Sequence, residues 1–147
     1  MDKDRLRLSS SGCTCVRLRK ASRRVSQIYD RSLEPLGLTV TQFSLLGYLD
    51  RLAGLSIGAL AEKLVMDPTT LTRNLRPLER RGLVVLAPDP NDRRARGLHL
   101  TAAGRKAYYK AKPAWARAQR HVDKALGDAD AVGLNTMLDR VLERLAE

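Results

Sequence analysis

The sequence has few aromatic residues and no long apolar run, and each shortage narrows what the protein can be. With one Phe and one Trp in 147 residues, a surface that stacks nucleobases on aromatic rings is a poor candidate. No apolar run approaches the roughly 18 residues of a membrane-spanning helix, so we expect no membrane association. Residues 1–8 alternate charges with leucine and lack the apolar stretch of a signal peptide. We therefore expect a cytoplasmic protein.

Motifs for catalysis and metal binding are also missing. The sequence has no Gly-rich phosphate loop, no Gly-x-Ser-x-Gly elbow and no His-Glu-x-x-His helix, so we expect neither an enzyme nor a cofactor. The two cysteines, Cys13 and Cys15, together with His99 and His121, lack the spacing of zinc ligands. We therefore predict no metal site, with a copper(I) ion held by the two cysteines as the alternative.

Acidic residues are scarce beside basic ones: 16 Asp and Glu against 27 Lys and Arg give a net charge of +11. The excess is concentrated in two segments, residues 1–31 and residues 73–105. All eight basic residues of the second segment are arginines, which suit bidentate contacts to phosphates and guanine edges. A solvated basic surface has the same composition, so the architecture must decide between the two.

The spacing of apolar residues predicts several helices. Apolar positions recur every three or four residues along 16–36, which indicates one face of a helix. Thr39 and Gln42 form a capping box at the start of a second helix. Ser56 caps a third, and Asp67 begins a fourth, because Asp is a favourable N-cap and proline follows it.

After the fourth helix, which ends at Gly82, the pattern changes to short β-rich stretches. Residues 83–86 and 98–100 predict two strands, and residues 89–96 predict a turn with a basic tip. Helix, turn, helix and hairpin in this order indicate a winged helix-turn-helix. Thr101 then caps a long helix, with a kink expected at Pro113, and an amphipathic helix follows.

The fold class we predict is mainly α with a small β hairpin. Residues 37–101 form the winged helix-turn-helix, which we expect to bind DNA. The N-terminal helix in residues 1–36 and the C-terminal helices in residues 102–147 are expected to serve dimerisation.

Five stretches with the spacing of a known family support this interpretation: Gly37 to Phe43, Leu60 to Leu64, Thr70 to Leu75, Leu78 to Leu83, and Asp89 to Arg94. On these stretches the sequence resembles the MarR family of transcriptional regulators. The resemblance implies an obligate homodimer that binds double-stranded DNA at an inverted-repeat operator, and repression is the commoner activity of the family. The rival from another class is a non-specific basic architectural protein that binds DNA or RNA.

The fourth helix is the expected recognition helix in the major groove. Six side chains face away from its leucines: Thr69, Thr70, Thr72, Arg73, Asn74 and Arg76. Arginine can contact guanine edges or phosphates, asparagine suits adenine, and the threonine methyls suit thymine. Thr69 and Thr70 also lie at the helix N-terminus, where backbone donors favour phosphate.

In the wing, the resemblance implies that Arg94 enters the minor groove and that Asp92 orients it. A narrow minor groove attracts arginine through its shape and negative potential. We expect Arg93 and Arg96 to contact the flanking phosphates.

The family responds to an oxidant or to a small ligand. Cys15 takes the place of the reactive cysteine of organic-hydroperoxide-sensing members, and Tyr29 that of a tyrosine that bonds it. A thiol near a helix N-terminus and beside basic side chains favours the thiolate, which peroxide oxidises to sulfenic acid. Cys13 is a candidate second thiol. However, Val40 and Arg19 stand where those sensors have aromatic residues.

A small aromatic or phenolic ligand is therefore an equal alternative. We expect its pocket between the dimerisation helices and the DNA-binding lobe, lined by Tyr29, Phe43, Leu46 and Tyr48. A constitutive regulator, with both cysteines buried in the dimer interface, is the third interpretation.

Overall fold

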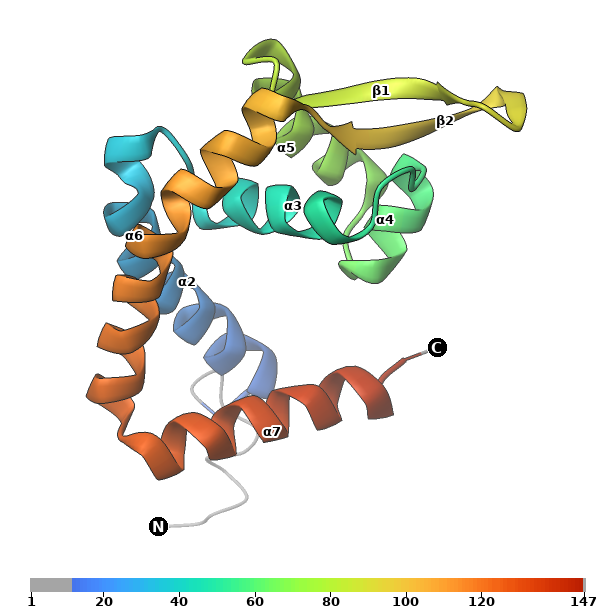
Figure 1. Ribbon diagram of the computed structural model, residues 1–147. Coiled ribbons are helices and arrows are strands. Elements are labelled where there is room, and N and C mark those ends of the chain that lie inside the picture. The colour runs from blue at the N-terminus through green and yellow to red at the C-terminus, as the bar shows by residue number, and fades with distance from the viewer. Residues whose placement is uncertain (1–11, 147) are drawn as a thin grey trace, which may run out of the picture. The chain divides into compact units, whose positions relative to one another are not determined.

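The computed structural model describes residues 12–146, which form helices and one antiparallel hairpin of two strands (Figure 1). The predicted fold class is confirmed. The described chain divides into two compact units. We call Leu33–Ala114 the central unit and residues 12–32 with 115–146 the terminal unit.

The centre of the central unit is α3 (Val40–Arg51). Its predicted capping box is confirmed: the Thr39 hydroxyl accepts from the backbone N–H of Gln42, and the Gln42 side chain accepts from that of Thr39. The core around it is formed by leucines that are almost completely buried: Leu45, Leu46, Leu49, Leu60, Leu71, Leu75, Leu78 and Leu98. Each contributes about 2 kcal/mol by burial, so these leucines set which face of each element points outward.

Two capped helices follow, α4 (Ile57–Lys63) and α5 (Pro68–Arg80). The Ser56 hydroxyl accepts from the backbone N–H of Ala59 at the start of α4, as the sequence predicts. Between the helices, Val65 adopts a left-handed backbone with φ of 50°. Gly82, with φ of 69°, follows the end of α5 in the left-handed conformation that only glycine adopts without strain.

The wing is longer than the sequence predicts. Its strands, β1 (Val84–Asp89) and β2 (Asp92–Leu100), pair from Val84 opposite Leu100 to Asp89 opposite Asp92. The Asp89 carboxylate accepts from the N–H of Asn91 at 2.8 Å, so the turn is complete within two residues. Arg93 and Arg94 follow the turn as part of β2 but have no partner on β1, because the register shifts between Pro88, which lies opposite Arg96, and Asp89, which lies opposite Asp92. The predicted turn at residues 89–96 is therefore too long, and the arginines of the predicted basic tip lie on β2 beside the turn.

The loop after α3 holds the base of β2. The backbone N–H of Gly54 donates to the carbonyl of Leu98 at 2.9 Å, and the N–H of Leu98 donates to the carbonyl of Leu55 at 2.8 Å. A Cβ at Gly97 would lie 2.6 Å from the Gly54 carbonyl oxygen. Glycine at position 97 thus permits this close backbone approach.

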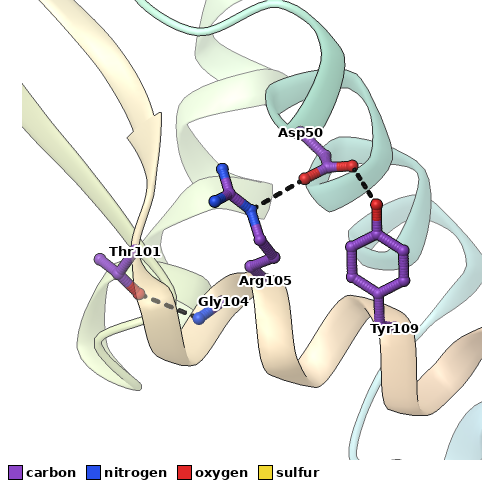
Figure 2. Close-up of polar contacts among 5 residues, drawn as sticks. All are labelled: Asp50, Thr101, Gly104, Arg105 and Tyr109. Atoms are coloured by element: carbon purple, nitrogen blue, oxygen red, sulfur yellow. Dashed lines mark hydrogen bonds and ion pairs between the residues drawn. The ribbon is translucent and has the colours of Figure 1, made fainter.

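The start of α6 (Ala102–Leu126) is fixed to the central unit by two sets of polar contacts. Thr101 donates from its hydroxyl to the carbonyl of Gly82 at 2.6 Å and accepts from the N–H of Gly104 at 3.0 Å. Figure 2 shows Asp50 of α3 between Arg105 and Tyr109 of α6, at 3.1 and 3.0 Å. These contacts anchor the wing-to-helix junction against α3.

The terminal unit contains most of α2 (Thr14–Leu33), the end of α6 and α7 (Asp128–Arg144). A short 3-10 helix, η1 (Glu34–Leu36), follows α2 and ends at Gly37 with φ of 70°, which agrees with the predicted end of the first helix. Pro113 lies inside α6, which continues through it. Large apolar side chains of the unit remain exposed: Leu18, Leu126, Val132, Leu134, Met137, Leu142 and Leu145.

Candidate nucleic-acid interface

The orientation of α5 is set by its buried leucines and its N-cap. Leu71, Leu75 and Leu78 are completely buried, so the opposite face of the helix is outward. The Asp67 carboxylate accepts from the backbone N–H groups of Thr69 and Thr70 at 3.1 and 3.2 Å. These are the donors that the sequence suggested for phosphate. Since Asp67 occupies them, any phosphate contact at this end must come from the threonine hydroxyls.

Four of the six predicted recognition residues surround one shallow hollow on the outward face. It has a volume of about 280 Å³ and is lined by Pro68, Thr69, Thr72, Arg73 and Arg76. Within residues 12–146, no hydrogen bond or ion pair engages the Arg73 or Arg76 guanidinium. Both are therefore available to an anionic or guanine partner.

The remaining polar side chains of α5 are partly occupied by the helix itself. The Thr72 hydroxyl donates to the carbonyl of Pro68, and the Asn74 amide donates to the carbonyl of Thr70, both at 2.9 Å. The Asn74 amide has two N–H donors, and the bond to Thr70 uses one of them. The two arginines, with no donor occupied among the described residues, are thus the stronger candidates for contact with a nucleic acid.

The arginines of the wing are exposed along β2. The Asp92 carboxylate accepts from the backbone N–H of Arg94 at 3.0 Å, so Asp92 fixes the main chain of Arg94 rather than its guanidinium. Arg93 and Arg94 lie where the register of the hairpin shifts and have no partner on β1, whereas Arg96 lies opposite Pro88. Arg96 donates to the carbonyl of Leu86 at 3.3 Å.

Other arginines of the same basic segment have structural partners, which the sequence does not indicate. Arg81 donates to the carbonyl of Gly37 at 2.6 Å. Arg105 forms the only ion pair found within residues 12–146, with Asp50. The hydrogen bond from Tyr109 to Asp50 and the charge of that carboxylate raise the pKa of Tyr109. The spacing of Arg105 and Tyr109 predicts a shared helix face, but no local pattern points to Asp50.

The predicted redox residues Cys15 and Tyr29 do not lie close together within one chain. Cys13 is half-buried just before α2, and Cys15 is exposed in its first turn. Tyr29 lies fourteen residues after Cys15 on the same continuous helix, about 21 Å away along the helix axis. Its hydroxyl donates to the Gln119 side chain at 2.5 Å. Burial and the charge of Asp123 raise the pKa of Tyr29.

The predicted ligand-pocket residues fall into both units. Tyr29 belongs to the terminal unit, and the other three belong to the central unit. Leu46 is completely buried, and the Phe43 ring packs on that of Tyr108 at 5.0 Å between centroids. Tyr48 is half-buried, with the Arg51 guanidinium 5.3 Å above its ring. In the central unit these side chains contribute to packing, and their role in binding stays a prediction.

Two further properties concern the described residues as a whole. Within residues 12–146, no three His, Cys, Asp or Glu side chains lie close enough together to hold a metal ion. No helix in the same range is long and apolar enough to cross a membrane.

Comparison with known proteins gives one family model and relatives that match part of the chain. Residues 36–95 match the sequence model of the MarR family. BadR of Rhodopseudomonas palustris, a transcriptional activatory protein, is 40% identical over 78 residues, which are 51% of this chain and 45% of BadR. A Thauera aromatica protein described as a transcriptional regulator for the hcr operon is 30% identical over 111 residues, which are 76% of this chain and 67% of that protein. The chain thus matches less than half of BadR.

Solved structures match over nearly the whole chain. The repressor CouR bound to a 23-mer DNA duplex shares 31% identity and a TM-score of 0.81, covering 92% of this chain and 96% of that one. CouR of Rhodococcus jostii RHA1 bound to p-coumaroyl-CoA shares 27% identity and a TM-score of 0.74, covering 92% and 93%. The similarity therefore includes residues of both units.

Proposed function

This chain belongs to the MarR family of winged helix-turn-helix transcriptional regulators, and we propose that it binds an inverted-repeat operator as a homodimer. The observation that carries the proposal is the outward face of α5. Arg73 and Arg76 line a hollow there without partners among the described residues, while buried leucines fix the opposite face. Such a face suits the major groove, where arginine contacts guanine edges.

The wing supplies the second contact in this proposal. Arg94 enters the minor groove next to the site of α5, and Arg93 and Arg96 contact the phosphates on either side. The exposed position of all three on β2 supports this role. Neutralising phosphates releases counterions, so operator affinity should fall with salt at a slope of about −0.9 per phosphate contact.

Dimerisation is assigned to α2, α6 and α7. The support is the apolar surface that α7 leaves exposed: Val132 is 66% exposed, Met137 54% and Leu142 58%. An apolar helix face of this kind favours burial against a second copy. Two recognition helices related by a two-fold axis would then contact half-sites about one helical turn, roughly 34 Å, apart.

We further propose that the dimer represses transcription and is released from DNA by one of two signals. An oxidant at Cys15 is supported by the exposure of that thiol at the start of a helix. The thiolate would attack an organic hydroperoxide, break its O–O bond and become sulfenic acid, while the rest of the hydroperoxide is released as the alcohol. Because Tyr29 lies about 21 Å farther along the same helix, its hydroxyl does not reach the Cys15 sulfur of the same chain. A small aromatic ligand is supported by the likeness to CouR bound to p-coumaroyl-CoA.

Selection of bound sequences from random oligonucleotides, together with analytical ultracentrifugation, tests the DNA-binding proposal. We expect a dimer, and an inverted repeat among the selected sequences. A monomer would contradict the proposal. So would binding without sequence preference, which a non-specific architectural protein would show.

An operator-release assay separates the two signals. Wild type, Cys15→Ser and the matched control Cys13→Ser are treated with cumene hydroperoxide on operator DNA. If Cys15 is the switch, wild type is released, whereas Cys15→Ser stays bound. Equal release of wild type and Cys15→Ser, or none of either, would eliminate the cysteine switch.

A further inference from the structure

We propose that Arg81, which caps the C-terminal end of α5, is a positioning residue that sets the spacing between the two operator half-sites. Its guanidinium Nη1 donates to the backbone carbonyl of Gly37 at 2.6 Å, across 44 residues of sequence. The inference rests on the proposed function. It concerns a property of DNA binding that the outward side chains of α5 do not themselves determine, because Arg81 acts through the position of the whole helix.

Gly37 is held by its own backbone in a position to accept this bond. It has a left-handed backbone with φ of 70°, which residues with a side chain rarely adopt. Its N–H donates to the carbonyl of Glu34 at 2.9 Å, and a Cβ at this position would lie 3.4 Å from Nη1 of Arg81. The carbonyl of Gly37 is thus a fixed point to which Arg81 ties the end of α5.

The same end of α5 is bonded to a second segment, the start of α6. The Thr101 hydroxyl donates to the carbonyl of Gly82 at 2.6 Å, and the Thr101 N–H donates to that of Leu83 at 3.0 Å. Figure 2 shows the hydroxyl also accepting from the N–H of Gly104 at 3.0 Å. A Cβ at Gly104 would collide with the carbonyl oxygen of Leu83, so α6 begins in direct contact with the backbone that follows α5.

These two segments are the connections of the central unit to the rest of the chain. The chain enters the unit at Leu33 and leaves it at Ala114. Gly37 follows soon after the entry, and Thr101 precedes α6, which leads to the exit. In a homodimer formed through α2, α6 and α7, the distance between the two recognition helices therefore depends on how each α5 is held against these segments. The bond from Arg81 is one of the contacts that hold it.

A small tilt of α5 is enough to change the half-site spacing. The helix runs from Pro68 to Arg80, so at 1.5 Å per residue a tilt of about 10° at its C-terminal end displaces its N-terminal end by about 3 Å. This is close to the rise of one base pair, about 3.4 Å. The buried leucines tolerate such a tilt because apolar contacts are non-directional, whereas a hydrogen bond depends on its angle. The bond from Arg81 to Gly37 thus resists the tilt.

The test is competition binding of the full chain to operators that have fixed half-sites and a spacer of varied length. Selection from random oligonucleotides supplies the half-site. We expect wild type to prefer one spacer length. In Arg81→Gln, whose shorter and uncharged side chain loses the bond, this preference should fall about tenfold, the effect of one charge-assisted hydrogen bond. The selected half-site sequence should stay the same, because the outward side chains of α5 are unchanged.

Three further variants control for charge and for folding. Arg80→Gln removes the same charge from the neighbouring residue, whose Nε donates within α5 to the carbonyl of Arg76 at 3.5 Å, and should keep the wild-type preference. Arg81→Lys retains the charge and one donor and should recover part of the preference. Thr101→Val removes the bond to Gly82 and should reduce the preference as Arg81→Gln does. Circular dichroism confirms that each variant is folded.

The outcomes separate this inference from the proposed function. An equal spacer preference in wild type and Arg81→Gln would contradict only this inference. A loss of affinity in Arg81→Gln that is the same at every spacer would also overturn it, because a residue that only stabilises the fold has that effect. If wild type selects no inverted repeat, the proposed function is contradicted, and this inference with it.

Discussion

The central and terminal units bury their apolar side chains to very different extents. Nine leucines of the central unit are almost completely buried, from Leu33 to Leu98. In the described part of the terminal unit, the buried apolar side chains are Tyr29, Ala118 and Ala131. Leucine contributes far more by burial than alanine does, so the central unit has a core of its own and the terminal unit has little of one.

This difference agrees with the roles that we propose, which are DNA binding for the central unit and dimerisation for the terminal unit. A DNA-contacting surface needs side chains held on rigid elements, and the leucine core holds α5 and β2 for this purpose. A dimerisation surface is apolar and is exposed in the single chain, because the second copy covers it only in the dimer. The helix α7 has such a face. The following variants test whether the two units differ in this way.

The largest effect on stability is expected for Leu75→Ala in the central unit. Leu75 is completely buried beneath the outward face of α5, and its truncation leaves a cavity. We expect the free energy of unfolding to fall by about 3 kcal/mol. Urea denaturation followed by circular dichroism measures it, and the loss should not depend on protein concentration.

Leu142→Ala is the matched variant in the terminal unit. Leu142 is 58% exposed on α7 within one chain, so its removal costs little unless a partner covers it. If a second copy does, Leu142→Ala weakens dimerisation whereas Leu75→Ala does not, and sedimentation at a series of protein concentrations shows this as a higher dissociation constant of the dimer. A dissociation constant equal to that of wild type would contradict the contrast between the units.

Arg94→Ala tests whether the central unit binds DNA through the wing. The side chain is exposed, so we expect unchanged unfolding but a tens-fold loss of operator affinity, about 2 kcal/mol. A gel-shift titration at constant salt measures it. The control Arg140→Ala removes one exposed charge from α7. Equal losses in both variants would indicate non-specific charge attraction.

The sequence predicted those features whose partners lie within a few residues. The caps at Thr39, Ser56 and Asp67 bond backbone groups two or three positions away, and residue type and spacing are enough to find them. The buried leucines followed equally from helical periodicity.

Features that depend on distant partners were not predictable. Asp50 meets Arg105 and Tyr109 more than fifty positions later, and no local pattern pairs them. The predicted strand bounds were wrong for a related reason: exposed arginines have no strong strand preference, and the extent of β2 depends on pairing with β1, which reaches from Leu100 opposite Val84 to Asp92 opposite Asp89. In α5, Thr72 and Asn74 each donate a hydrogen bond to a backbone carbonyl of the same helix, which residue type alone does not show.

Tyr29→Phe tests the small buried centre of the terminal unit. It removes the hydrogen bond to Gln119, so the free energy of unfolding at pH 7 should fall by about 1 kcal/mol. Burial and Asp123 raise the pKa of Tyr29 above 10, which means that the folded state favours the protonated phenol. Its contribution is therefore complete below pH 10 and is lost as the pH rises through the folded-state pKa. Denaturation at pH 7 and above pH 10 should show the gap between wild type and variant narrowing, and a constant gap would disprove this account.

The smallest effect is expected at the turn between α4 and α5. Val65 is the one non-glycine residue with positive φ among residues 12–146, and it is 79% exposed. A left-handed backbone costs a β-branched residue about 1–2 kcal/mol. We infer that the packing of the helices on either side of the turn holds Val65 in this conformation. Val65→Gly removes this strain without losing packing, but glycine also gives the unfolded chain more freedom, at about 0.5–1 kcal/mol. We expect a net gain of about 0.5 kcal/mol in the free energy of unfolding, measured by urea denaturation.

Val85→Gly, at an exposed position of β1, should instead lose stability. If Val65→Gly also loses stability, the core of the central unit does not hold this turn under strain.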